Sequence, residues 1–178
     1  MMMDFKEVIN SRREVTQFLD KRIPKQTIDE ILQVGLLVPT GNHLRSREFI
    51  VVQEQSKLTH LAKTTPFMPW LEDAKLGIVI TGRPDVSKYW LQDASIASGH
   101  LWLAAVNAGL GCAFGAVLNT TDDVESNERE TYVRKALSIP DDRRVLAILG
   151  IGYEAEPPSA KQPHEWDEII HYETFSTN

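Results

Sequence analysis

The sequence WLQDASIASGHLWLAAVNAGLG, residues 90–111, reads as one long helix with apolar or small side chains on nearly every face. A helix of that kind belongs either in the interior of a domain or in a membrane. Asp93, His100 and other polar residues interrupt it too often for a membrane span, which needs about 20 mostly apolar residues. Gly109 is placed to end the helix in a left-handed conformation. We therefore expect residues 90–111 to form the central helix of a core around which the other elements wrap.

Length and composition narrow the classes of protein to which the chain can belong. The 178 residues fit a single domain spanning residues 1–178, and 42% hydrophobic content supplies a core without metals or disulfides. The net charge of −6 argues against non-specific nucleic-acid binding, which requires a basic face. Cys112 is the single cysteine, so no intrachain disulfide forms, and we expect it to be a small buried residue. With no signal-peptide pattern in MMMDFKEV and no membrane span, the expected location is cytoplasmic.

Helical and strand patterns alternate along the rest of the chain. Besides the central helix, we expect helices over residues 4–11, 24–37, 56–63 and 119–137. We expect strands over residues 48–53, 75–81, 111–117 and 144–153. This alternation predicts an α/β or α+β domain in which the long helix lies across a covered sheet of about four strands.

Three of these elements carry more detailed expectations. The apolar run at residues 49–52 is typical of a central strand covered on both faces. Ser56 is the expected N-cap of its helix. The core-facing stripe of the second helix consists of Ile28, Ile31, Leu32, Val34 and Leu36.

The C-terminal part differs from the rest. Prolines and charges from Glu154 onward indicate an extended arm over about residues 154–178. The arm ends in apolar Ile169, Ile170 and Tyr172, and an apolar end beyond a polar arm suggests packing on a partner subunit.

Three segments are candidates for function, each with an ordinary structural alternative. Arg12 and Arg13 form either a solvated surface or a phosphate clamp, since guanidinium groups match phosphate oxygens. Residues 40–43 form either a plain turn or a loop whose backbone amides approach a flat or charged ligand. Residues 64–72, with Phe67 and Trp70, either plug the core or line an apolar cavity.

Other types of catalytic site find no support in the sequence. The five histidines show no metal-ligand spacing, so we expect no metal site. No Cys–His or Ser–His–Asp arrangement can be argued, and no GxGxxG fingerprint occurs. We therefore expect no catalytic side-chain cluster.

Four segments, in this order and spacing, resemble the nitroreductase-like flavoprotein family over residues 5–172. They are Ser11-Arg12-Arg13 with Phe18; Pro39-Thr40-Gly41-Asn42-His43-Leu44-Arg45 leading into Phe49-Ile50-Val51-Val52; Asp93 with Leu103-Ala104-Ala105 and Gly109-Leu110-Gly111; and Leu149-Gly150-Ile151-Gly152-Tyr153. The resemblance implies an α+β, three-layer fold with a mostly antiparallel sheet of about four to five strands around a long buried helix. It also implies a homodimer that exchanges its C-terminal arms and binds two FMN molecules at the subunit interface.

The implied activity is FMN-dependent NAD(P)H oxidoreduction. In this family, hydride comes from NADH or NADPH, and two electrons pass to nitroaromatics, quinones or similar small-molecule acceptors. The implied FMN-contacting residues are Arg12, Arg13, Glu14, Thr16, Pro39, Thr40, Gly41, Asn42, His43, Arg45, Gly111 and Lys161. Arg12 and Arg13 match the phosphate grip, residues 39–43 match the segment that the other subunit lays against the isoalloxazine, and Gly111 matches a turn near the ring. Lys161, with His164 as a competitor, matches a further phosphate-binding cation.

The chain departs from the family pattern at several of these positions. Glu14 replaces a serine that hydrogen-bonds the phosphate, and Thr16 replaces a cation near the pyrimidine end of the ring. His43 and Arg45 replace the usual Asn and Gln, while residues 99–100 replace Gln-Asn. We hypothesise that Arg45 or Arg13 takes over the charge lost at Thr16.

Two other functions remain open. The first alternative to the oxidoreductase activity is a family-fold protein that binds flavin weakly or not at all and acts as a binding or regulatory module. The second is a specialised flavin enzyme. Phe67 and Trp70 are either a lid over the ring or ordinary core aromatics.

Overall fold

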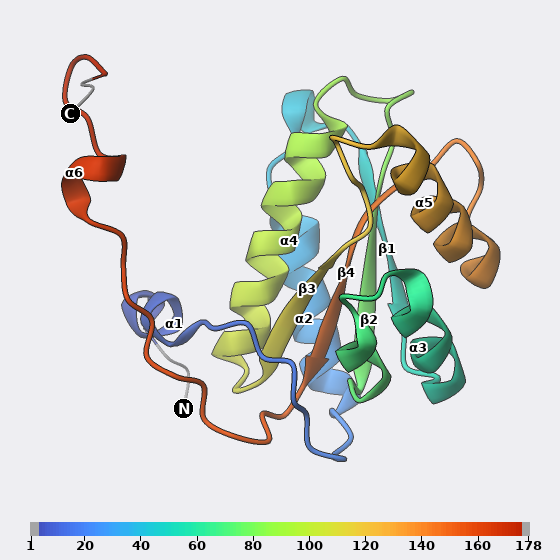
Figure 1. The fold of residues 1–178 in the computed structure, drawn as a ribbon, viewed down its shortest axis with the longest axis horizontal. Coiled ribbons are helices and arrows are strands. Elements are labelled where there is room, and N and C mark those ends of the chain that lie inside the picture. The colour runs from blue at the N-terminus through green and yellow to red at the C-terminus, as the bar shows by residue number, and fades with distance from the viewer. Residues whose placement is uncertain (1–3, 176–178) are drawn as a thin grey trace.

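A computed structural model describes residues 4–175 of the chain (Figure 1). Four strands form one sheet in the order β1-β2-β4-β3, with each neighbouring pair antiparallel. The strands are β1 (Arg47–Val52), β2 (Leu76–Gly82), β3 (Gly111–Ala116) and β4 (Arg144–Gly152). The helices are α1 (Phe5–Ser11), α2 (Lys25–Leu37), α3 (Gln55–Leu61), α4 (Trp90–Asn107), α5 (Asp123–Leu137) and α6 (Trp166–Ile169), with 3₁₀ turns η1 (Gly41–His43), η2 (Ala62–Thr64) and η3 (Pro69–Glu72). The α+β fold class is confirmed.

The sheet is covered on both faces, and β2 shows how its residues serve both layers. Leu76, Ile78 and Ile80 belong to a core cluster shared with α2 and α4. Val79 belongs to a second cluster, shared with α3 and α5. Because side chains alternate between the two faces of a strand, an unbroken apolar run fills both cores. The domain therefore has three layers, with α2 and α4 on one side of the sheet and α3 and α5 on the other (Figure 1).

The long helix α4 lies on one face of the sheet rather than being enclosed on all sides. Ala94, Ala97 and Leu101 are buried against the sheet and α2, and Gly109 ends the segment at a φ of 74°, as predicted. Ile96, however, is 42% exposed, and a Cβ added at Gly99 would meet no atom within 4 Å. One face of α4 is thus open to solvent in a single chain.

The expectation that residues 48–53 form a central strand is wrong. β1 is an edge strand, paired only with β2 among the described strands, and Val51 is exposed. A run of apolar residues shows that a strand packs well but not which neighbours it has, because strand order is set by the chain's tertiary path.

Two expectations about helices also need correction. Along α2, Leu36 is 77% exposed, and Gly35 faces the core in its place, where a Cβ would lie 3.0 Å from both Leu101 and Phe49. At the start of α3, the N-cap position belongs to Glu54, and the Ser56 hydroxyl donates to the Glu54 carboxylate instead of capping the backbone. In both cases the true position lies one or two residues from the predicted one.

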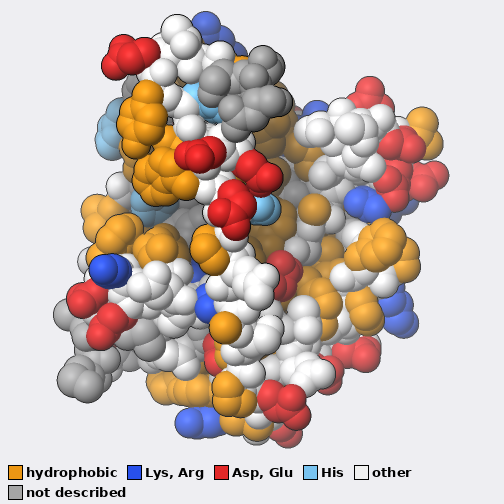
Figure 2. Space-filling model, turned by 60° about the vertical axis from the view of Figure 1, so that its left-hand side comes forward, with side chains coloured by type: hydrophobic (Ala, Val, Ile, Leu, Met, Phe, Trp, Pro, Cys, Tyr) orange, Lys and Arg blue, Asp and Glu red, His pale blue; other side chains and the backbone are white. Residues whose placement is uncertain are grey.

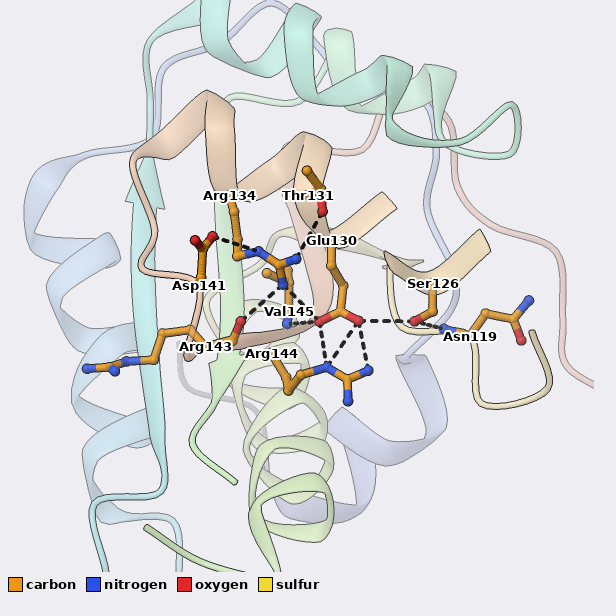
Figure 3. Close-up of polar contacts among 9 residues, drawn as sticks. All are labelled: Asn119, Ser126, Glu130, Thr131, Arg134, Asp141, Arg143, Arg144 and Val145. Carbon is orange, nitrogen blue, oxygen red and sulfur yellow. Dashed lines mark hydrogen bonds and ion pairs between the residues drawn. The ribbon is translucent and has the colours of Figure 1, made fainter. Parts of the chain in front are cut away.

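A buried carboxylate joins α5 to β4 (Figure 3). Glu130 is 1% exposed and accepts hydrogen bonds from Arg144 Nε at 2.9 Å and from the Val145 backbone N–H at 2.8 Å. The Ser126 hydroxyl donates to the same group at 3.1 Å, and Arg134 forms an ion pair with it at 3.5 Å. These partners supply the charge compensation and hydrogen bonds that a buried carboxylate requires.

After β4 the chain leaves the domain as the extended arm that the sequence predicted (Figure 1). Trp166, Ile169 and Tyr172 are all exposed. On the side from which the arm projects, hydrophobic side chains are interspersed with acidic ones (Figure 2). Within residues 4–175, no helix has the length and apolar character needed to cross a membrane.

Candidate functional site

The loop between α2 and β1 is held at both ends by one buried carboxylate. Asp93, in the first turn of α4, accepts a hydrogen bond from the Gly41 backbone N–H at 2.9 Å and another from the Ser46 hydroxyl. Between these anchors, Asn42 and His43 adopt φ angles of 55° and 57°. Two consecutive non-glycine residues in the left-handed region are uncommon and persist where the surrounding structure fixes them. The loop is therefore held in one defined shape.

Arg47 holds the end of α2, where the same loop begins. Its Nη2 donates to the backbone carbonyls of Gly35 at 2.9 Å and Val38 at 2.6 Å, at the C-terminal end of α2. Burial lowers the pKa of the Arg47 guanidinium, and the negative charge of Asp93 opposes that shift. Arg47 and Ser46 belong to no sequence motif, so their role in shaping the loop could be found only in the structure.

A cleft of about 890 Å³ opens beside this loop. Its lining includes the loop residues Thr40, His43, Leu44 and Arg45, with Phe49 of β1.

Most charges around the cleft are already paired. Glu48 forms an ion pair with Arg143, and Arg83 pairs with Asp85. Arg45 has no hydrogen bond or ion pair within residues 4–175 and is exposed. The cleft thus presents one free guanidinium beside apolar walls.

The two adjacent arginines near the N-terminus have different roles in the structure. Arg13 donates from Nε to the Ser159 carbonyl at 2.9 Å and from Nη1 to the carbonyls of Asn10 and Arg12. It therefore ties the base of the arm to the N-terminal segment. Arg12 donates no hydrogen bond within the described chain, and its guanidinium lies over the Trp102 ring, 4.9 Å from the centroid. Of the pair, Arg12 is the one free to bind an anion.

The segment after the arginines lies along the outer edge of β3. The Val15 N–H donates to the Cys112 carbonyl at 3.1 Å, and the Glu14 carboxylate accepts from the Phe114 N–H at 3.2 Å. Glu14 pairs with neither arginine in the described structure, so its charge is directed to the strand edge. Gly111 is buried, and a Cβ there would lie 2.6 Å from Val15. Thr16 is exposed.

Within one chain the predicted site residues fall into two separate groups. Asp93 anchors the loop of residues 39–45, whereas Trp102, under Arg12, follows nine residues later on α4. That interval corresponds to about 14 Å along the helix and, at about 100° per residue, to the opposite flank. Lys161 lies on the arm, two residues after Ser159, whose carbonyl accepts a hydrogen bond from Arg13. The helix itself therefore separates the two groups.

Two further features lie apart from both groups. Trp70 packs over Gly150 and belongs with the core on the α3–α5 side, while Phe67 is exposed; α4 and Arg12 lie on the other side of the sheet. Burial raises the pKa of the Cys112 thiol, which fits a packing residue. Over residues 4–175, no group of three or more His, Cys, Asp or Glu side chains is arranged to hold a metal ion.

Comparisons with known proteins find relatives that cover most of the chain. The model of the Nitroreductase family matches residues 9–65 and 55–153. An FMN-dependent nitroreductase from Clostridium difficile R20291 superposes with a TM-score of 0.87 at 32% identity, covering 94% of this chain and 98% of that one. A Methanothermobacter thermautotrophicus protein, provisionally named NADH dehydrogenase/NAD(P)H nitroreductase, is 31% identical over 94% of this chain and 86% of its own. Iodotyrosine deiodinase 1 of Sus scrofa is more distant, at 24% identity over 86% of this chain and 62% of its own.

Proposed function

The chain belongs to the nitroreductase family, and we propose that it is an FMN-dependent NAD(P)H oxidoreductase. The observation that carries this proposal is the state of Arg12. A half-buried guanidinium without a hydrogen-bonding partner is costly to keep, and it is the group best suited to a phosphate. We assign the second cation to Lys161, which is exposed and lies two residues after Ser159, the arm residue that Arg13 holds.

The residues at this position fit FMN. The flavin's phosphate needs about two compensating charges, which Arg12 and Lys161 supply. Glu14 would repel the phosphate if it pointed toward it, but its carboxylate is engaged with the Phe114 N–H at the β3 edge. Arg13, engaged with three carbonyls, holds the segment in place and does not serve as the second phosphate ligand.

Completion of the site requires a second copy of the chain. The open face of α4, with Ile96, Gly99 and His100, lies between the two groups of site residues. A two-fold partner packed across this face brings its own loop, residues 39–45, to the flank that carries Arg12. The exposed apolar side chains of the arm offer further surface for the partner to cover. We therefore infer a homodimer with exchanged arms and two flavin sites.

Bound FMN supplies the redox chemistry, accepting a hydride from NADH or NADPH and passing two electrons to a nitroaromatic, a quinone or a similar small acceptor. The protein binds and orients the reactants. Asp93 fixes the loop, and the adjoining cleft offers Leu44 and Phe49 as walls for a flat molecule. Arg45 places a positive charge there, and we assign to it the role of the cation missing at Thr16. The lack of disulfides and the buried single cysteine agree with a cytoplasmic location.

The experiment is an absorbance spectrum of the purified protein, taken before and after adding FMN and then NADH or NADPH without oxygen. We expect flavin bands that bleach on reduction and recover when a quinone is added. The matched variant Arg12→Ala should lose most of the bound flavin. A wild-type protein that takes up no FMN at tens of micromolar would overturn the proposal and favour a flavin-free binding module.

A further inference from the structure

Arg12, Trp102 and Phe114 form a stack of three side chains in which Trp102 contacts both of the others. Its guanidinium lies 4.9 Å from the centroid of the Trp102 ring. On β3, the Phe114 ring is nearly parallel to that of Trp102, with an interplanar angle of 9° and centroids 6.5 Å apart. The stack joins three elements: the segment after α1, the helix α4 and the strand β3.

Trp102 is the contact that holds the Arg12 guanidinium. No hydrogen bond or ion pair fixes that group within the described residues. An unrestrained arginine side chain loses rotamer entropy when it binds a ligand, and this loss weakens binding. A planar guanidinium stacked on an aromatic face loses part of that freedom beforehand, while its N–H groups, which lie in the plane, stay free to donate. Stacking therefore prepares Arg12 for two parallel hydrogen bonds to a phosphate.

The indole of Trp102 carries a second indication. Its Nε1–H is buried and has no partner in the described structure. Buried donors are nearly always satisfied, so an unsatisfied one calls for an explanation. Among the described residues the ring is therefore held by its packing and by its contacts with Arg12 and Phe114, not by a hydrogen bond.

We propose that Trp102 is a positioning residue that holds the Arg12 guanidinium ready for the phosphate of FMN. This inference rests on the proposed function, because it assigns Arg12 to the flavin phosphate. Phe114, whose ring is stacked with that of Trp102, helps to keep the indole in place.

The test compares FMN with riboflavin, which lacks the phosphate, by fluorescence titration of the flavin-free protein. In Trp102→Leu, the Kd for FMN should rise about 5- to 30-fold, the range expected when the Arg12 side chain regains most of its rotamer freedom before binding. The Kd for riboflavin should stay within about 2-fold. Trp102→Phe keeps an aromatic face and should recover most of the affinity for FMN. In an Arg12→Ala background, Trp102→Leu should cause no further loss, because the two residues act through one contact.

The control is Trp70→Leu, which removes a half-buried tryptophan on the opposite side of the sheet and should leave both affinities unchanged. Equal weakening of FMN and riboflavin in Trp102→Leu, or no weakening at all, would overturn the positioning role while the proposed function stands. If the leucine variant does not fold, Trp102→Met tests the same point with a larger side chain. A wild-type protein that binds neither flavin would overturn both proposals.

Discussion

Replacing Glu130 by alanine should lower the free energy of unfolding by about 3 kcal/mol. The change leaves the buried Val145 N–H without its acceptor, which costs about 1–3 kcal/mol. It also leaves the Arg134 guanidinium, whose side chain is 11% exposed, without its closest carboxylate. The Arg144 side chain is 39% exposed and can turn to water, so loss of its ion pair with Glu130 adds little to the cost. The sum lies at the lower end of the range of about 3–5 kcal/mol for breaking a buried ion pair.

Thermal and urea unfolding measure this change. For a chain of this length, about 3 kcal/mol corresponds to a decrease in Tm of about 6–12 °C. The matched control is Asp29→Ala, which breaks the exposed ion pair between Lys25 and Asp29 and should cost less than about 1 kcal/mol. Equal losses of unfolding free energy in Glu130→Ala and Asp29→Ala would refute the reasoning that burial makes the Glu130 contacts strong.

The pH dependence of stability provides a second readout of the same residue. Burial acts to raise the Glu130 pKa, but the hydrogen bonds and charge of Arg144, with the Val145 N–H and Ser126, outweigh it and leave the pKa below its usual value. A carboxyl with a lowered pKa in the folded state stabilises the fold above its unfolded pKa of about 4.3, and this contribution is lost as the pH falls further. The stability difference between wild type and Glu130→Gln should therefore narrow between about pH 5 and pH 3. A difference that stays constant over this range would show that Glu130 keeps its ordinary pKa.

Two further predictions concern the flavin site. Arg45→Ala should make the midpoint potential of bound FMN more negative by about 30 mV, equal to about 1.4 kcal/mol for two electrons, because the reduced ring loses a nearby cation. Redox titration against a reference dye measures it, with the exposed Arg22→Ala as control, and an unchanged potential removes Arg45 from this role. Gly99→Arg should convert the proposed dimer to single chains and release FMN, because it places a long charged side chain on the open face of α4. Size-exclusion chromatography checks this, and a stable dimer with full flavin content would contradict the proposed packing.

Elements with strong periodicity could be predicted from the sequence. The pattern predicts the central helix at residues 90–111, because its buried face and the glycine that follows it are local features. The helix spans Trp90–Asn107. The position of β1 in the sheet could not be predicted, because Phe49 to Val52 carry the same pattern in an edge strand as in a central one.

Prediction of the functional residues from the sequence is limited in the same way. The sequence indicated the arginine pair, but only the structure separates the two members, because Arg13 is engaged by Ser159, 146 residues away. Asp93 could be placed on the helix from its sequence position. Its partners Gly41 and Ser46 could not be found, since they come from a loop about fifty residues earlier. Side-chain contacts between distant segments leave no local pattern.

The central claim is that each flavin site needs two chains, and sedimentation of the FMN-loaded protein tests it most directly. Protein absorbance and the visible flavin band are followed in the same run. We predict that the flavin sediments only with a species of about 40 kDa, twice the 20.1 kDa of one chain, at one flavin per chain. Flavin that sediments with a single chain of 20.1 kDa would contradict the account.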